Sequence, residues 1–220
     1  MAGQLVIAME KLLDRIEKLG LLPVIKIETA ADAVPLARAL KEGGLPAAEI
    51  TFRTDAAEEA IRAITEAFPE FLIVAGTVLT EEQADRAIAA GASLIVAPGF
   101  APELVQYCRK KGYPIVPGVC TPSEIAVALR MGLSHLKFFP AEASGGVKMI
   151  KALAAPYGMV RFMPTGGVSL ENLGAYLGEK AVFSCGGSWL APARDIREGR
   201  FDEICKRTAA AVALVKEIRA

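Results

Sequence analysis

The sequence predicts an α/β fold, a compact (β/α)8 TIM barrel preceded by one extra N-terminal helix. Eight short apolar runs alternate with eight helix-forming stretches rich in Ala, Glu and Arg. Strict alternation of this kind is typical of parallel strands joined by helices. The units are short, at roughly 20–27 residues each, which favours a compact closed barrel. The expected strands are Leu22–Ile27, Ala48–Phe52, Phe71–Ala75, Ser93–Ala97, Pro114–Pro117, Leu133–Phe138, Val160–Met163 and Ala181–Cys185.

Helix start signals support the same alternation. Thr80 and Thr121 each precede a Gln or a Glu by three positions, as in a capping box. Residues 4–19 repeat apolar positions among Glu and Lys and predict the extra helix. No linker interrupts the pattern, so we expect residues 1–220 to form one domain. The remaining helices are expected to begin near Ala30, Asp55, Glu81, Pro102, Pro122, Val147, Ser169 and Ala191.

An open doubly wound sheet is the alternative architecture. A dinucleotide-binding sheet of that kind carries a G-x-G-x-x-G motif after its first strand. This sequence has no such motif there, so the closed barrel is preferred.

Composition excludes several functional classes. The chain has 220 residues, and its 25 Lys and Arg balance 25 Asp and Glu, so no basic field attracts nucleic acid or a membrane surface. The first helix is too charged for a signal peptide, and no segment is apolar enough to span a bilayer. The four cysteines lack a C-x-x-C pair, which suits a reducing cytoplasm. A single histidine argues against a metal site, and we expect no cofactor.

Lys137 stands within an apolar strand, close to the strand end where such barrels carry their chemistry. Either it lies on an edge strand and reaches water, or it is buried and its amine attacks a ketone. His135 lies two residues before Lys137, so its side chain points to the same face of the strand. It is expected to be a hydrogen-bonded core residue. Lys26 is the rival lysine, and its alternation with Glu28 favours a structural pair.

The second predicted strand has one polar and one apolar face. Glu49, Thr51 and Arg53 share the first, and Ile50 and Phe52 share the second. Since the apolar face should pack on helices, the polar face points into the barrel. One interpretation is a self-neutralising Glu–Arg pair. The preferred one makes Glu49 a general acid/base and Arg53 a clamp for a substrate carboxylate.

Three further residues are candidates for the rim of the site. Alternation predicts that Ile73, Ala75 and Thr77 point inward, with Thr77 offering a hydroxyl, although a threonine here can also be a helix cap. Pro98 forms a Pro-Gly corner that either lets the backbone approach a ligand or is ordinary loop structure. Phe139 follows the lysine strand, and both Pro98 and Phe139 are expected to line the site.

Paired glycines follow the last two predicted strands. They are Gly166 with Gly167, and Gly186 with Gly187, which Ser188 follows. Many barrels bind phosphate at this place through backbone N–H groups, and two tight turns are the alternative. The pattern favours a phosphate site at Gly166, Gly167, Gly187 and Ser188. An interior lysine, a carboxylate, a carboxylate clamp and a phosphate cradle together fit Schiff-base chemistry on a phosphorylated keto acid.

Several segments also carry a resemblance to a known family. In the same order over almost the whole chain, they resemble the bacterial 2-keto-3-deoxy-6-phosphogluconate aldolases, which are also described as bifunctional with 4-hydroxy-2-oxoglutarate aldolase. Lys-Phe-Phe-Pro-Ala-Glu at 137–142, followed by Gly145-Gly146, is the most specific of them. The others are Glu49–Thr54, Ala75–Val78, Pro164–Val168 and Gly186–Leu190.

The resemblance implies a metal-independent class I lyase, usually a homotrimer, acting on small molecules. It implies that 2-dehydro-3-deoxy-6-phosphogluconate is cleaved reversibly to pyruvate and glyceraldehyde 3-phosphate in the Entner–Doudoroff pathway. Lys137 matches the Schiff-base lysine and Glu49 the general acid/base. Arg53 and Thr77 match the pyruvate carboxylate positions, and Gly166, Gly167 and Ser188 match the phosphate positions. Alternatives are an aldolase for 4-hydroxy-2-oxoglutarate or the phosphogalactonate epimer, and a non-catalytic phosphate-binding barrel.

Overall fold

The structure is a computed structural model that describes residues 2–219. Residues 1 and 220 of the predicted domain lie outside this range. The chain begins with helix α1 (Ala2–Leu19), which starts two residues before the predicted extra helix and ends where it was expected.

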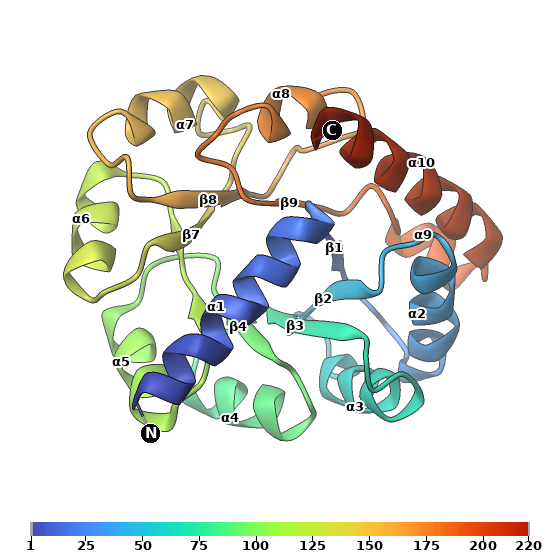
Figure 1. Cartoon of the computed structure of the whole chain (residues 1–220). Coiled ribbons are helices and arrows are strands. Elements are labelled where there is room, and N and C mark those ends of the chain that lie inside the picture. Colours follow the sequence, from blue (N-terminus) through green and yellow to red (C-terminus); the bar gives the residue numbers. More distant parts are fainter. Residues whose placement is uncertain (1, 220) are drawn as a thin grey trace.

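Short parallel strands form a curled sheet, and helices cover its outer side (Figure 1). Their hydrogen-bonded order is β5-β4-β3-β2-β1-β9 in one sheet and β6-β7-β8 in the other. A parallel bridge between Thr165 and Gly186 links the end of β8 to β9. The strands are β1 (Leu21–Ile25), β2 (Ala47–Thr51), β3 (Leu72–Gly76), β4 (Leu94–Val96), β5 (Ile115–Val116), β6 (Gly118–Val119), β7 (His135–Phe138), β8 (Arg161–Pro164) and β9 (Cys185–Gly187).

The helices follow the strands in turn, as the alternation predicted. Thr80 accepts a hydrogen bond from the Gln83 N–H, and Thr121 forms a capping box with Glu124, so both predicted caps are confirmed. A short 3-10 turn (Ala30–Asp32) precedes the second helix. The helices are α2 (Ala33–Glu42), α3 (Ala57–Ala67), α4 (Glu81–Ala89), α5 (Pro102–Lys111), α6 (Pro122–Arg130), α7 (Gly146–Ala154), α8 (Leu173–Leu177), α9 (Ala193–Arg197) and α10 (Phe201–Arg219).

Beyond shifts of one to four residues at the ends of several strands and helices, three elements differ from the prediction. The fifth strand is broken into β5 and β6 at Pro117, which has no N–H to donate to a neighbouring strand. The last strand is shifted to Cys185–Gly187, where two glycines hid it from a pattern of apolar residues. The helix expected from Ala191 is two helices, because Gly199 between them has a left-handed φ of 68°.

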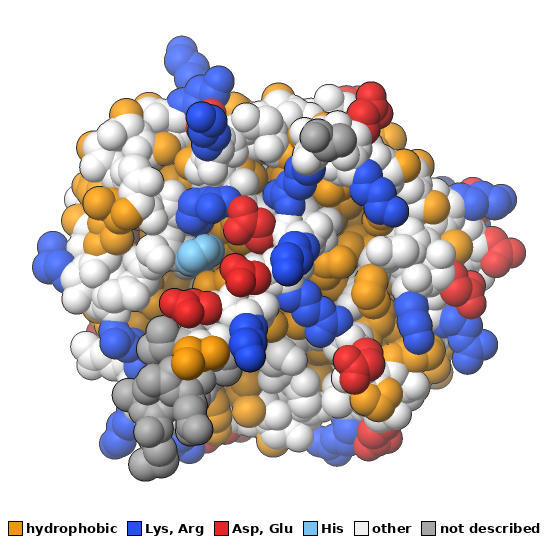
Figure 2. Space-filling view, in the orientation of Figure 1, with side chains coloured by type: hydrophobic (Ala, Val, Ile, Leu, Met, Phe, Trp, Pro, Cys, Tyr) orange, Lys and Arg blue, Asp and Glu red, His pale blue; other side chains and the backbone are white. Residues whose placement is uncertain are grey.

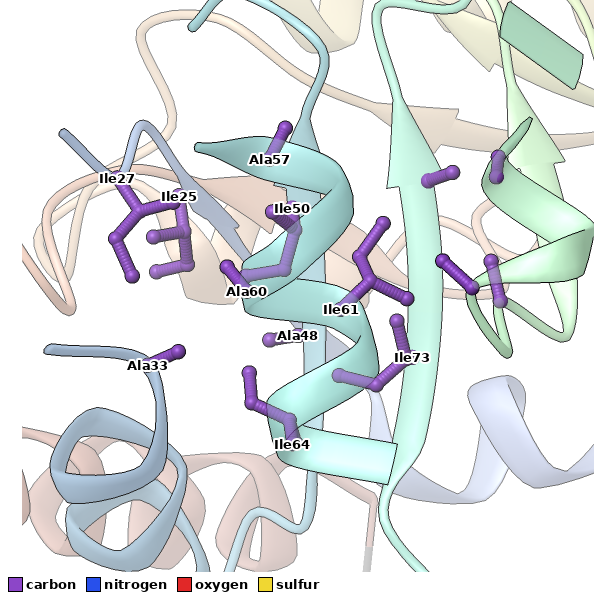
Figure 3. Packing of buried hydrophobic residues seen from close by; sticks show 14 of the residues in the cluster. Ile25, Ile27, Ala33, Ala48, Ile50, Ala57, Ala60, Ile61, Ile64 and Ile73 are labelled. Carbon is purple, nitrogen blue, oxygen red and sulfur yellow. The ribbon is translucent and has the colours of Figure 1, made fainter. Parts of the chain in front are cut away.

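An outer apolar layer joins the sheet to its helices. Ile50 of β2 and Ile73 of β3 pack with Ile61 and Ile64 of α3 in this layer (Figure 3). Ala75 belongs to it too, so the prediction that Ile73 and Ala75 point inward was wrong. The register explains the error, since Ala75 pairs with Ile50 and neighbours in register lie on the same side of a sheet.

An inner apolar layer fills the other side of the curled sheet. Helix α1 covers this layer at the N-terminal ends of the strands. Leu22, Leu72 and Leu94, near the starts of three strands, pack with Leu13 and Ile16 of α1. Figure 1 shows α1 lying across this face of the molecule. The N-terminal ends of the strands are therefore closed, which leaves the C-terminal ends for a site.

The closed face carries charges of both signs. Figure 2 shows acidic and basic side chains interspersed across its middle. Arg161 at the start of β8 pairs here with Glu17 of α1, at 2.5 Å. His135 is half-buried and packs edge-to-face on Phe183, with 5.1 Å between ring centroids, and burial lowers its pKa.

Among the described residues, no helix combines the length and apolarity needed to cross a bilayer.

Candidate active site

Lys137 lies inside the molecule. It occupies the third position of β7, between β6 and β8, and its Cα partners are Gly118 and Met163. Met163 belongs to the inner layer, so Lys137 points inward with it. The residue is 3% exposed, and β7 has a neighbour on each side. The alternative of an edge-strand lysine that reaches water is therefore wrong.

Glu49 meets Lys137 across the interior. Lys137 Nζ donates to Glu49 Oε1 at 3.1 Å, and the Glu49 side chain is fully buried. The second carboxylate oxygen, Oε2, has no partner among the described residues. Leaving a buried acceptor unpaired typically costs about 1–3 kcal/mol. The contact therefore leaves one acceptor available in the interior, next to the amine.

Arg53 follows the end of β2 and has no carboxylate partner among the described residues. Its Nε donates to Thr51 Oγ1 at 3.1 Å, and that hydroxyl donates in turn to the Ile25 carbonyl at 2.8 Å. The alternative of a Glu49–Arg53 pair is therefore wrong, because Glu49 pairs with Lys137. The side chain is exposed, and a guanidinium in this state can take a carboxylate from a ligand.

Thr77 follows β3 with an unusual backbone. Its φ of 57° lies in the left-handed region, which is rare for a β-branched residue and costs about 1–3 kcal/mol. Thr80, not Thr77, caps α4, so the interpretation of Thr77 as that helix cap was wrong. Thr77 is half-buried, and it turns the chain away from the strand directly after Gly76.

The two glycine pairs lie on neighbouring strand ends. Gly166 and Gly167 have φ values of 97° and 82°, which only glycine adopts readily. The bridge from Thr165 to Gly186 places the second pair beside the first. Gly187 lies under the Trp189 ring, since a Cβ there would be 1.6 Å from the ring. The Trp189 ring therefore packs on the backbone of the second glycine pair.

Ser188 and Pro98 are placed by the loops that follow β9 and β4. Ser188 is exposed, directly after the second glycine pair. Pro98 is half-buried, and its carbonyl would lie 2.2 Å from a Cβ at Gly118, the residue that pairs with Lys137.

Phe139 lies between the lysine and the first glycine pair. Lys137 Nζ is 5.4 Å from the centroid of its ring, and the same ring would lie 3.4 Å from a Cβ at Gly166. The Phe139–Pro140 peptide bond is cis. Beyond it the chain pairs with the loop after β8, where the Ala141 N–H donates to the Thr165 carbonyl at 2.8 Å.

Thr165 was missed as a site residue. It is 5% exposed, and its hydroxyl has no partner among the described residues. Thr165 lies two residues after Met163, whose side chain belongs to the inner layer, so the Thr165 side chain is expected on the same face. Alternation along β8 could have identified Thr165, but the expectation for this strand end rested on the glycines that follow it.

Lys26 and Cys120 fall outside this arrangement. Lys26 Nζ pairs with Glu28 at 3.2 Å, as predicted, and both side chains are well exposed. Burial raises the pKa of the Cys120 thiol, which therefore stays protonated. Within residues 2–219, no group of three or more His, Cys, Asp or Glu side chains is placed to hold a metal ion.

A buried amine beside a buried carboxylate can perform covalent carbonyl chemistry. The carboxylate can take the proton that the ammonium must lose before the nitrogen attacks a carbonyl. Arg53 follows the strand that carries Glu49, and the two glycine pairs lie at the ends of β8 and β9.

Comparison with known proteins gives a consistent result. Residues 12–207 match the sequence profile of the family described as "Aldolase: KDPG and KHG aldolase". The 2-dehydro-3-deoxy-phosphogluconate aldolase of Treponema pallidum is 50% identical over 191 residues, which cover 87% of this chain and 91% of that protein. The enzyme of the same description from Haemophilus influenzae is 45% identical over 207 residues, covering 94% and 98%.

A solved structure agrees in fold and in sequence. The KDPG aldolase of Legionella pneumophila, described with pyruvate captured as a covalent carbinolamine, superimposes with a TM-score of 0.85 at 40% identity. The match covers 87% of this chain and 93% of that one. With a profile that spans most of its length and relatives this similar, the chain belongs to the KDPG and KHG aldolase family.

Proposed function

We propose that this protein is a class I aldolase that cleaves 2-dehydro-3-deoxy-6-phosphogluconate (KDPG) reversibly to pyruvate and glyceraldehyde 3-phosphate. The observation that carries the proposal is the 3.1 Å contact between Lys137 Nζ and Glu49 Oε1. Both side chains are buried, on strands β7 and β2. Membership of the aldolase family supports it independently.

The chemistry follows from the pair. Glu49 takes a proton from Lys137, and the neutral amine attacks the C2 carbonyl of the substrate to form a carbinolamine. Glu49 gives its proton to the departing hydroxyl, and loss of water leaves a protonated imine. The C3–C4 bond then breaks: its electron pair moves into the imine to form an enamine, the C4 hydroxyl gives its proton to the Glu49 carboxylate or to a water that it orients, and the aldehyde leaves. Glu49 or a water that it orients returns a proton to C3, and hydrolysis releases pyruvate and the free amine.

The flanking residues hold the two ends of the substrate. Arg53 and Thr77 bind the carboxylate next to the reacting carbonyl, since a guanidinium and a hydroxyl are suitable donors. Gly166, Gly167, Gly187 and Ser188 bind the phosphate through backbone N–H groups and one hydroxyl. Pro98 and Phe139 line the space between, and Thr165 adds a buried hydroxyl that has no partner among the described residues.

Cleavage of 4-hydroxy-2-oxoglutarate to pyruvate and glyoxylate is the second candidate activity. The description of the family names both aldolases. Its substrate has no phosphate, so the reaction needs the lysine and the carboxylate but not the glycine pairs. Measuring kcat/KM for both substrates ranks the two activities. A phosphate site that contributes to binding requires the phosphorylated substrate to be preferred.

We also propose the finer architecture. The two sheets form one closed (β/α)8 barrel in a single domain, because β5 pairs with β4 and β6 pairs with β7 on either side of Pro117. The bridge from Thr165 to Gly186 supports closure at the opposite seam. The protein is a cytoplasmic homotrimer in this proposal, and sedimentation equilibrium measures the oligomer.

Reductive trapping tests the proposed chemistry. Protein is mixed with pyruvate and sodium borohydride, and its intact mass and peptide map are measured. We expect one reduced pyruvate adduct, on Lys137, and none on Lys26, which serves as an internal control. An adduct elsewhere, or no adduct on a folded protein, would contradict the proposal.

A further inference from the structure

Gly76, the last residue of β3, lies directly beneath the Glu49 carboxylate. The residue is buried, and its Cα partners are Thr51 of β2 and Val96 of β4. Glu49 stands two positions before Thr51, so its side chain leans along the strand to lie over Gly76. Gly76 is not one of the described glycines that have a left-handed φ. Its backbone therefore does not require glycine.

The space above Gly76 does require it. A Cβ at this position would lie 2.1 Å from Glu49 Oε1, 2.5 Å from Cγ and 2.6 Å from Cδ. Non-bonded carbon atoms prefer separations of about 3.5–4.0 Å, so a methyl group and this carboxylate cannot coexist. These three atoms are the nearest to such a Cβ, and all of them belong to Glu49.

The displaced oxygen is the one that contacts the lysine. Oε1 accepts the hydrogen bond from Lys137 Nζ at 3.1 Å. Glu49 is fully buried, so it has no route to relax into solvent. Moving Oε1 by one or two ångströms would break the contact with Nζ while leaving the lysine on its own strand.

We infer that Gly76 is a positioning residue for proton transfer: its missing side chain sets the distance between the Glu49 carboxylate and the Lys137 amine. The inference rests on the proposed aldolase function for its kinetic consequence. The contact itself is a property of the two side chains. A misplacement of about 1 Å in a reacting group can reduce a rate by about 10²-fold.

The test compares Gly76→Ala with Gly158→Ala, where a Cβ has no heavy atom within 4 Å and φ is not left-handed. Two readouts separate the roles. Deuterium exchange into the pyruvate methyl group measures proton transfer, and the yield of the borohydride-trapped adduct at equilibrium measures the lysine. We expect Gly76→Ala to slow exchange by about 10²-fold with the adduct retained. Gly158→Ala should change neither the exchange rate nor the adduct yield. An exchange rate in Gly76→Ala equal to that of the wild-type protein would overturn the inference.

A second pair of variants tests whether the effect passes through Glu49. Glu49→Ala removes Cγ, Cδ and both oxygens, so the methyl group of Gly76→Ala then has room. In that background, Gly76→Ala should change neither the thermal midpoint nor the residual exchange rate, whereas alone it should lower both. If Gly76→Ala does not fold, the double variant should fold. Equal penalties in both backgrounds, or a double variant that does not fold where Glu49→Ala alone does fold, would overturn the inference.

The two hypotheses can fail separately. Absence of an adduct in the wild-type protein would contradict the aldolase proposal. The stability comparison between single and double variants would still measure the Gly76–Glu49 contact.

Discussion

Two lysine–glutamate pairs of nearly equal length stand in very different surroundings. Lys26 and Glu28 are 3.2 Å apart, and Lys137 and Glu49 are 3.1 Å apart. The first pair has side chains 44% and 45% exposed, and the second has side chains 4% and 0% exposed. Distance therefore says little about what a pair does.

Burial makes the difference. Exposed pairs are screened by water and contribute little to stability. Two charges taken into an apolar interior lose hydration, and the loss of one partner typically costs about 3–5 kcal/mol. In the interior, water screens neither partner, so the amine and the carboxylate act on each other directly. The buried pair is therefore suited to chemistry, and the exposed pair is suited to holding a loop.

The largest expected effect comes from removing the buried amine. Lys137→Met should abolish aldol cleavage and the borohydride-trapped adduct, because methionine has no amine that can form an imine. Circular dichroism checks that the fold survives. Turnover at the wild-type level in a folded variant would refute the Schiff-base mechanism.

An intermediate effect is expected from neutralising the buried carboxylate. Glu49→Gln keeps the shape of the side chain but removes its ability to take a proton. We expect deuterium exchange into the pyruvate methyl group to fall by about 10²–10⁴-fold. Pyruvate affinity, measured by calorimetry, should change far less. Equal losses in exchange and affinity would assign Glu49 a structural role instead.

The smallest effect is expected from the exposed pair. Lys26 lowers the pKa of the Glu28 carboxyl through a hydrogen bond and its charge, so Lys26→Met should raise that pKa toward the ordinary value of 4.5. A depressed carboxyl pKa contributes stability above its unfolded pKa, and that contribution is lost as the pH falls through the folded pKa. The stability of the variant should therefore depend slightly less on pH in the acid range, and its turnover should equal that of the wild-type protein. Carbon-13 NMR titration of Glu28 measures the shift, and a substantial loss of turnover would show that the exposed pair also serves the reaction.

Sequence alone located the buried pair but not its neighbours. Lys137 and Glu49 are unusual residues in apolar strands, so composition and alternation revealed them before any resemblance was considered. Thr165 is not unusual by type, and its importance depends on a hydroxyl left without a partner in three dimensions. Gly76 is similar, because its role is visible only through the Glu49 atoms that a Cβ would meet.

The facing of β3 was predicted wrongly for a related reason. Leu72 and Val74 point to one face of β3, Ile73 and Ala75 point to the other, and all four are apolar. A strand that is buried on both faces therefore gives no sign in its own sequence of which face is turned inward. Its pairing with Ile50 decides the matter, and pairing is a long-range property. The strands and their order in the sequence were predictable because each depends on local composition.

Helix α1 has a practical consequence for attaching this protein to other objects. It lies under the closed end of the sheet, and Arg219, near the end of α10, donates to the Glu17 and Phe183 carbonyls at the same end. The second half of α1 and the end of α10 are thus anchored at the N-terminal end of the sheet. A tether joined through either helix would hold the protein to a surface or a scaffold with the C-terminal ends of the strands directed outward.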